Sequence, residues 1–452
     1  MKNNWRQTFH PEPHSGWMND PNGLCWYKGE YHVFFQYSPD STDGSTSKYW
    51  GHYTSSDLIN WTFHGAAVAP DTEYDKNGAY SGCAVITDER MHLFYTGNVK
   101  YEGSHDYITS GRGANVIHIA SEDPYSFDKK QVLLRNIDYP SFCSCHVRDP
   151  KIWSDGQTWY MVLGARTLSD EGCVLIYKSD NLLTWLYDRV ITKENFGYMW
   201  ECPDYFELSD KKFLSISPQG LTHQKTKFQN VYQSGWFDIT EKDHHMVPGK
   251  FHEWDMGFDF YAPQSFEAPD SRRLMIGWMG LPDIPYENPT VACGWQHCLT
   301  CVREITCDDN GNLLQAPVKE LKKLRCSQTD LSADETVLVS LPFELEASPQ
   351  GEFSITIDNG LIIEYNNSDG LFRLQFTDKS LGGGRDTRLC EINRCSSVHV
   401  LCDKSSIEIF LNNGSTVLSS RIYPEDESVR LTINRTDAVL WNLRKKEVVS
   451  NE

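Results

Sequence analysis

The sequence predicts an all-β protein in which a five-bladed β-propeller is followed by an antiparallel β-sandwich. We expect the propeller over residues 1–317, a linker with one short helix over 318–334 and the sandwich over 335–452. Three observations carry this prediction. A strand-and-turn pattern recurs five times, helical periodicity is almost absent from the first part of the chain, and the strands become shorter after about residue 331.

The repeated unit is a short apolar strand that follows a tight turn and is preceded by another short strand. The starts of successive copies are separated by roughly 53 to 68 residues. The five copies are residues 31–35, 91–95, 159–163, 212–216 and 273–277. Repeats of this length made only of strands and turns are typical of β-propellers, in which each repeat is one four-stranded blade. A β-sandwich is the alternative, but it does not explain the regular spacing.

The last third of the chain has a different character. Short strands such as residues 353–357 and 371–376 alternate with turns rich in Asn, Asp and Gly. Strands this short with frequent turns are typical of an antiparallel sandwich. The Lys-rich residues 318–334 lie between the two patterns, so we expect the linker there.

Composition excludes several classes of function. The net charge of −20 argues against nucleic acid or an anionic membrane as a partner, although a local cluster of bases could still bind a small anion. No apolar run approaches the roughly 18 residues that span a bilayer, and the first ten residues lack the apolar core of a secretory signal. We therefore expect a cytoplasmic protein, or one supplied in mature form. Whether the chain forms a homo-oligomer is left open.

The 14 cysteines do not indicate a metal site. Several, such as Cys25 and Cys173, fall at apolar strand positions, where a reduced cysteine acts as a small hydrophobe. A structural zinc site usually needs two Cys-x2-Cys elements, and the sequence contains one, Cys298 with Cys301. We expect reduced thiols, no metal and no cofactor.

Acidic residues stand at similar places in several repeats. About ten residues before the second strand of each repeat the sequence has Asp20, Ser81, Asp149, Glu201 and Ala262. In a propeller the innermost strands line the central channel, so we expect these positions to face one another. Crowded carboxylates raise one another's pKa values, and a fold without a use for them would avoid the arrangement. The three acids therefore predict a functional site.

Three acids at one channel mouth suit the hydrolysis of a glycoside. One carboxylate attacks or positions water and a second protonates the leaving oxygen, while the third can stabilise the positive charge of the transition state. The sequence also contains aromatic faces and hydrogen-bonding side chains suited to a sugar: Trp17, Trp50, Tyr80, Trp200, Trp278 and Trp295, with Asn19, Gln36 and Arg148. For each tryptophan taken alone, core packing is the favoured interpretation.

Three motifs resemble the signatures of glycoside hydrolase family 32, which contains invertases, sucrose-6-phosphate hydrolases, inulinases and levanases. They are Trp-Met-Asn-Asp-Pro-Asn-Gly at 17–23, Arg-Asp-Pro at 148–150 and Glu-Cys-Pro at 201–203. Further matches lie at residues 35–37, 50–52, 81–82 and 258–264. The resemblance covers essentially the whole chain, including the region of the C-terminal sandwich.

The resemblance implies a retaining β-fructofuranosidase that acts on sucrose, sucrose 6-phosphate or short fructo-oligosaccharides through a covalent fructosyl-enzyme. It implies Asp20 as nucleophile, Glu201 as acid and base, and Asp149 as stabiliser of the transition state. Arg148 would tune the acids, and the fructose contacts would include Asn19, Gln36, Ser81 and Trp278. Fructosyl transfer by the same residues stays open, as does a non-catalytic sugar-binding propeller.

Within the family, residues 276–282 and 294–300 are most similar to bacterial cytoplasmic sucrose or sucrose-6-phosphate hydrolases. Residues 38–48 lack the tryptophan that family members often carry there, and this affects the side of the site that receives the leaving group. A phosphorylated leaving group would need bases. His223, Lys225 and Lys227 are candidates, with a solvated surface loop as the alternative.

Overall fold

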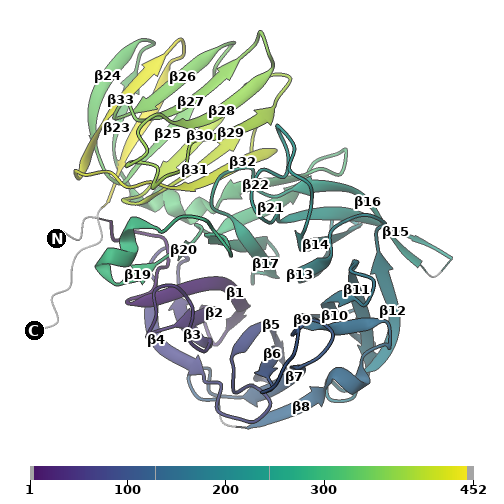
Figure 1. Cartoon of the computed structure of the whole chain (residues 1–452). Helices are drawn as coiled ribbons and strands as arrows, with labels where there is room; N and C mark the ends of the chain where they lie inside the picture. The colour runs from purple at the N-terminus through teal and green to yellow at the C-terminus, as the bar shows by residue number, and fades with distance from the viewer. Residues whose placement is uncertain (1–4, 128, 244, 445–452) are drawn as a thin grey trace, which may run out of the picture.

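The computed structural model of the chain describes residues 5–127, 129–243 and 245–444. Nearly every regular element in these residues is a β-strand. The exceptions are three short 3-10 helices: η1 (Asn136–Asp138), η2 (Pro289–Cys293) and η3 (Lys319–Leu324). No helix in these ranges is long and apolar enough to cross a membrane. The predicted all-β combination of a propeller and a sandwich is confirmed (Figure 1).

Five sheets form the first part of the described chain, each mainly from consecutive strands. The first holds β1 (Gly16–Tyr27), β2 (Glu30–Ser38), β3 (Tyr49–Ser55) and β4 (Thr62–Val68). The second holds β5 (Ala79–Thr87), β6 (Arg90–Lys100), β7 (Arg112–Ser121) and β8 (Lys130–Leu134). The third holds β9 (Cys143–Ser154), β10 (Trp159–Thr167), β11 (Gly172–Ser179) and β12 (Leu186–Thr192).

The fourth and fifth sheets continue this order. The fourth holds β13 (Met199–Leu208), β14 (Lys211–Gln219), β15 (Gly235–Lys242) and β16 (His245–Glu253). The fifth holds β17 (Tyr261–Glu267), β18 (Arg273–Met279), β21 (Arg303–Cys307) and β22 (Leu313–Pro317), and the short β20 (Cys298–Leu299) also pairs with β18. The recurring apolar segments of the sequence are the second strands of these sheets, as predicted.

Tight hairpins connect the first and second strands of several sheets. Two residues separate β1 from β2, and both have the positive φ of a type I′ turn: Lys28 (φ 48°) and Gly29 (φ 86°). The same conformation occurs at Asp88 and Glu89 between β5 and β6. This turn matches the right-handed twist of the flanking strands, which explains why the predicted turns lie where the sequence indicated.

The first strands of the five sheets form a ring. β1 lies against β5, β5 against β9, β9 against β13, and β13 against β17, which returns to β1 (Figure 1). The ring is closed by β19 (Trp295–Gln296), which pairs in parallel with β1 in the register Gly16 to Trp295. The backbone N–H of Gly16 also donates to the carbonyl of Gly294 over 2.9 Å. A late segment of the chain thereby completes the first sheet.

The second part of the chain is a sandwich of two six-stranded antiparallel sheets around an apolar core. One sheet runs β23 (Arg325–Leu331), β34 (Ala438–Leu443), β25 (Phe343–Ala347), β30 (Val398–Cys402), β31 (Ser406–Leu411), β32 (Thr416–Arg421). The other runs β24 (Glu335–Ser340), β33 (Ser428–Asn434), β26 (Phe353–Ile357), β27 (Leu361–Asn366), β28 (Leu371–Phe376), β29 (Thr387–Glu391). Within residues 318–334, η3 is followed by β23, which pairs with β34 and so belongs to the sandwich.

A buried polar network joins the two parts. Arg303, on β21 of the propeller, is fully buried and donates to Glu408 of the sandwich over 2.5 and 2.9 Å. It also donates to Asp255 over 3.1 Å. His10 bridges Glu408 and Asp403 over 2.8 and 2.9 Å, and these acids raise the pKa of its imidazole to about 9 against the effect of burial. Each buried charge in the network therefore has a charged partner.

Candidate active site

Each first strand carries a β-bulge at the end that opens into the channel. The register shifts lie after Met18 in β1, Ala79 in β5, Arg148 in β9, Glu201 in β13 and Tyr261 in β17. At each shift two residues of the first strand face one residue of the second. A bulge changes the direction of the side chains that it contains. Because every first strand has one, the bulges direct residues from different sheets towards the same part of the channel.

Asp20 lies in the bulge of β1, with 9% of its surface exposed. Its Oδ2 accepts hydrogen bonds from the Ser81 hydroxyl over 2.5 Å and the Gln36 amide over 3.0 Å. Its Oδ1 accepts from the Asn19 amide over 3.1 Å. Burial raises the pKa of Asp20, although the bond from Ser81 opposes this rise. Oδ1 is the less engaged of the two oxygens.

Asp149 lies in the bulge of β9 with a left-handed backbone, φ 63°. A non-glycine residue adopts this conformation only where its surroundings hold it. The Asp149 N–H donates to the Thr96 hydroxyl, and its Oδ2 accepts from the Cys202 N–H, both over 2.9 Å. Burial raises the pKa of Asp149 to about 7, against the attraction of the neighbouring Arg148.

Glu201 is bound through both carboxylate oxygens. Oε1 accepts from Arg148 over 2.7 and 3.1 Å. Oε2 accepts from the Tyr261 hydroxyl over 2.6 Å and the Gln219 amide over 2.8 Å. All these groups can donate hydrogen bonds, so both oxygens of the carboxyl group are held in place. The side chain is fixed in orientation while part of it stays exposed to the channel.

Arg148 is held from its far side by a histidine. Its Nη1 donates to Nδ1 of His146 over 2.7 Å, and Nε2 of the same ring lies 2.9 Å from the carbonyl oxygen of Tyr107. These partners require a neutral imidazole with its proton on Nε2. Burial and the charge of Arg148 lower the pKa of His146 to about 3. A series of hydrogen bonds thus connects Tyr107 through His146 and Arg148 to Glu201.

The structure corrects the predicted alignment of the repeats, because Asp20 is the second residue of its bulge, Asp149 is the first residue of its bulge and Glu201 comes directly before its bulge. Asp149 lies within its bulge, but the matching residue of β13 is Cys202, which shares the positive φ (46°). Glu201 precedes its bulge, as Arg148 does in β9. Glu201 is therefore the equivalent of Arg148, and this explains why the two side chains meet as neighbours around the ring.

The three acids line one pocket of about 480 Å³. Of the predicted sugar contacts, Asn19, Gln36, Tyr80, Arg148 and Trp278 line it as well. The indole N–H of Trp278 is buried without a hydrogen-bond partner among the described residues.

Ser81 and Trp50, which were also predicted to contact the sugar, do not line this pocket. Ser81 is buried and contacts Asp20 and Gln36, so it supports the acid from beneath. Trp50 is fully buried between Phe34 and Tyr95. Its ring faces are therefore covered by protein, and its N–H donates to the carbonyl of Tyr80 over 2.9 Å. The prediction that Trp50 offers a face to the sugar is not supported, because the ring belongs to the core.

The predicted phosphate candidates lie elsewhere. His223, Lys225 and Lys227 are exposed, and none of them lines the pocket of the three acids. The basic residues that line it are Lys48, Arg112, His146 and Arg148, of which sequence reasoning named only Arg148.

Sequence reasoning also missed Gln219 and Tyr261, which bind Glu201. A signal for Gln219 was present, because it ends β14 as Gln36 stands near the end of β2. Tyr261 lies inside the motif at residues 258–264 and directly precedes its bulge. Lys48 precedes β3 and Arg112 opens β7, where the repeat pattern gives no alignment, whereas His146 lies within β9, two residues before Arg148.

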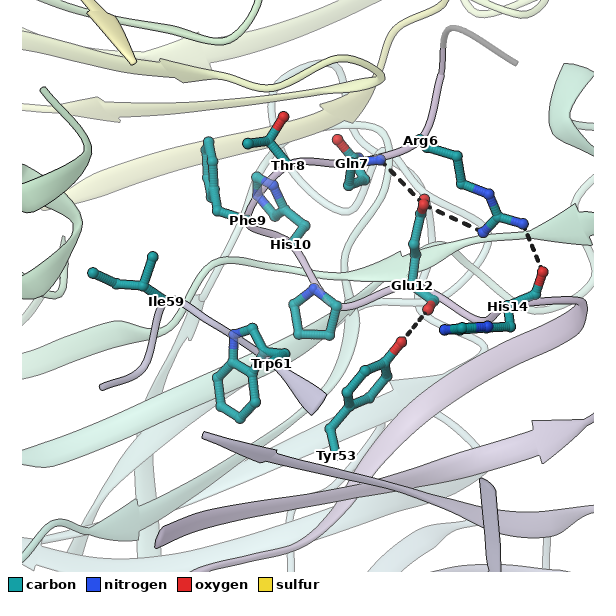
Figure 2. A pocket seen from close by; sticks show the side chains of 11 residues that line it. Arg6, Gln7, Thr8, Phe9, His10, Glu12, His14, Tyr53, Ile59 and Trp61 are labelled. Atoms are coloured by element: carbon teal, nitrogen blue, oxygen red, sulfur yellow. Dashed lines mark hydrogen bonds and ion pairs between the residues drawn. The ribbon is translucent and has the colours of Figure 1, made fainter. Parts of the chain in front are cut away.

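A second hollow, of about 320 Å³, lies between the N-terminal segment and the first sheet (Figure 2). Glu12 accepts from Arg6 over 3.3 Å and from the Gln7 N–H over 3.1 Å, and the Tyr53 hydroxyl donates to the Glu12 carbonyl over 2.5 Å (Figure 2). None of the three acids lines this hollow. The candidate site is therefore the channel pocket.

Comparison with known proteins identifies the family. The sequence model of the "Glycosyl hydrolases family 32 N-terminal domain" matches residues 10–317, and that of the "Glycosyl hydrolases family 32 C terminal" matches residues 312–446. The chain belongs to glycosyl hydrolase family 32. It is therefore a glycoside hydrolase, and the resemblance seen in its motifs is confirmed.

Family 32 relatives resemble the chain over nearly its whole length. A sucrose-6-phosphate hydrolase of Bacillus subtilis is 40% identical, covering 95% of this chain and 91% of the relative. A raffinose invertase of Escherichia coli is 36% identical, covering 98% and 96%. The solved structure of a sucrose-6-phosphate hydrolase from Lactobacillus gasseri superposes with a TM-score of 0.90 at 28% identity, covering 98% of this chain and 94% of that one.

Proposed function

We propose that this family 32 enzyme hydrolyses the β-fructofuranoside bond of sucrose or sucrose 6-phosphate and retains the configuration at the anomeric carbon. The observation that carries the proposal is the pairing of Asp20 and Glu201 in one pocket with different surroundings. Asp20 is buried beneath hydrogen-bond donors, whereas Glu201 is held in place and reachable from the channel. Relatives named sucrose-6-phosphate hydrolase and raffinose invertase support the substrate class.

In the first step Asp20 attacks the anomeric C2 of the fructosyl unit through Oδ1, its less engaged oxygen. The C2–O bond to the leaving sugar breaks, and Glu201 gives its proton to the departing oxygen. Positive charge develops at C2, and Asp149 stabilises it once its carboxylate is ionised. The product of this step is a fructosyl ester of Asp20.

In the second step Glu201, now ionised, takes a proton from water, and the resulting hydroxide attacks C2. The ester bond breaks, Asp20 is released as a carboxylate and Glu201 is protonated again. Arg148, Tyr261 and Gln219 keep the Glu201 carboxylate in one orientation for both transfers. A sugar hydroxyl in place of water would give fructosyl transfer, which product analysis at high sucrose concentration separates from hydrolysis.

The covalent intermediate provides the test. We expect Glu201→Gln, mixed with a fructosyl fluoride whose leaving group needs no protonation, to accumulate protein with the added mass of one fructosyl unit, because the first step then proceeds without an acid while the second step lacks its base. Asp20→Asn should show no added mass and almost no turnover, with unchanged circular dichroism. Turnover by Asp20→Asn near the wild-type rate would contradict the proposal, as would the same added mass in that variant.

We also propose that the enzyme works in the cytoplasm. A sugar phosphate carries charge and does not cross a bilayer unaided, so an enzyme for it belongs where it is produced. The 14 cysteines are free in the described chain, as expected in a reducing compartment. Cell fractionation followed by assay of sucrose 6-phosphate hydrolysis tests this, and activity confined to the medium would contradict it.

A further inference from the structure

One arginine in the active-site pocket has no acidic partner. Arg112 opens β7, lines the pocket and is partly buried. Its Nε donates to the Tyr107 carbonyl over 3.2 Å and its Nη1 to the Asn98 amide oxygen over 2.8 Å. The neighbouring Arg148 is neutralised by Glu201, but no carboxylate of the described residues forms an ion pair with Arg112. Its charge is partly desolvated and has no carboxylate counter-charge in the described part of the chain.

The other cations of the pocket have structural partners. Lys48 donates to the Gly44 carbonyl over 2.7 Å and to the Ser38 hydroxyl over 3.0 Å, and so fixes the loop between β2 and β3. His146 is neutral and bound through both ring nitrogens. Arg112 combines a permanent charge and the absence of a carboxylate partner with three N–H groups beyond those bonded to Tyr107 and Asn98, because a guanidinium has five N–H groups.

Charge is distributed unevenly around the pocket. The pocket-lining acids Asp43 and Asp283 follow β2 and β18, whereas Arg112 and Arg148 lie on β7 and β9. Since Arg148 is paired with Glu201, Arg112 on the second sheet is the arginine that can attract an anion entering the pocket. The nucleophile Asp20 and Asp149 are almost fully buried, while Arg112 is partly exposed. Fructose bound at the two acids leaves the departing sugar nearer the mouth, beside Glu201.

We propose that Arg112 binds the phosphate of a sugar phosphate leaving group and so sets the preference for sucrose 6-phosphate over sucrose. The inference rests on the proposed function, since it assumes a fructosyl bond cleaved at Asp20 and Glu201. The planar guanidinium recognises phosphate oxygens in pairs and keeps its charge at all working pH values. A phosphate would provide the counter-charge that the protein itself does not supply.

The test compares kcat/KM on sucrose 6-phosphate and on sucrose for the wild type and matched variants. We expect Arg112→Ala to lower kcat/KM on sucrose 6-phosphate by about 100-fold and on sucrose by less than about 5-fold. Arg112→Lys should fall between, because lysine keeps the charge without the paired donors. Lys48→Met should lower both values by a similar factor, since it loosens a loop. Lys225→Ala, on the exposed loop, should change neither.

Product inhibition gives a second measurement. Glucose 6-phosphate should inhibit wild-type sucrose hydrolysis at much lower concentration than glucose, and Arg112→Lys should weaken the inhibition. An equal loss on both substrates in Arg112→Ala, or inhibition by glucose 6-phosphate that Arg112→Lys leaves unchanged, would overturn the assignment. A wild type that cleaves neither substrate would instead refute the proposed function. A wild type that cleaves sucrose without preference for the phosphorylated substrate refutes the role of Arg112 alone.

Discussion

The backbone N–H of Cys202 donates a hydrogen bond of 2.9 Å to Oδ2 of Asp149. The residue after the candidate acid thus anchors a second carboxylate of the site. The anchor is a main-chain group held in a bulge, so it does not depend on a rotatable side chain. The positions of Glu201 and Asp149 relative to each other therefore follow from the geometry of the strands. Substitutions of the side chains around them should change the catalytic rate more than they change the structure.

Tyr261→Phe removes one of the donors to Glu201. The loss of a hydrogen bond to a charged group in the pocket is expected to lower kcat about 10-fold, with KM little changed. Rates with sucrose at saturating concentration measure this. The matched control is Tyr101→Phe, an exposed tyrosine outside the pocket, which should keep the wild-type kcat. Equal rates for both variants would mean that the Tyr261 bond does not contribute to catalysis.

Activity should fall on the acid side at an unusually high pH. Burial raises the pKa of Asp149 to about 7 and also raises that of Asp20. Both must be ionised to act, so kcat/KM should drop roughly 10-fold per pH unit below about pH 7. Sucrose is the substrate to use, because a phosphate titrates near pH 6 itself. A profile that stays flat to about pH 4, where exposed aspartates lose their charge, would contradict the role of burial.

Asp149→Asn should stabilise the protein at neutral pH while abolishing most activity. The pKa of Asp149 is about 7 in the folded chain and 3.8 in the reference state. The folded state therefore binds a proton more tightly, and stability is lost as the pH rises from about 4 to 7. An uncharged asparagine avoids this loss.

Thermal unfolding at two pH values measures the effect. The gain in Tm over wild type should be larger at pH 7.5 than at pH 4.5, by at least about 2 °C. Asp309→Asn, at an exposed position, is the control and should show no such difference. A gain independent of pH would indicate a packing effect in place of the ionisation.

Arg303→Met should weaken the junction between propeller and sandwich. The substitution leaves Glu408 and Asp255 buried without their shared cation, which is expected to lower stability by about 3–5 kcal/mol. Arg435→Met breaks an exposed pair with Glu352 and should cost less than about 1 kcal/mol. Urea unfolding followed by tryptophan fluorescence compares them, and similar losses for both would show that burial of the network is unimportant.

Much of the fold was predictable because strands and turns repeat in the sequence. The apolar segment at residues 31–35 and its counterparts are second strands, and the turn at Lys28 and Gly29 has the expected conformation. The three acids were also recognisable, because each stands next to a proline motif at the start of a repeat. The extent of the linker was harder to predict, since β23 pairs with a strand more than a hundred residues later.

The details of the site depended on geometry that spacing does not encode. A bulge inserts one extra residue into a strand. Counting back from the second strand therefore aligned Glu201 with Asp149, although the residue of β13 that is equivalent to Asp149 is Cys202. Trp50 illustrates a second limit. Its position on β3 is compatible with either face of the sheet, and only the packing of Phe34 and Tyr95 against it assigns it to the core.

The pairing of β19 with β1 has a consequence for the nascent chain on the ribosome. Gly16 emerges from the exit tunnel long before Trp295, its partner in the register. Throughout this interval the edge of β1 has unpaired N–H and C=O groups, which can join strands of other chains. Synthesis at about 5 to 20 residues per second makes the exposure last tens of seconds. The start of the first sheet is thus open to pairing with other chains until Trp295 and Gln296 have been synthesised.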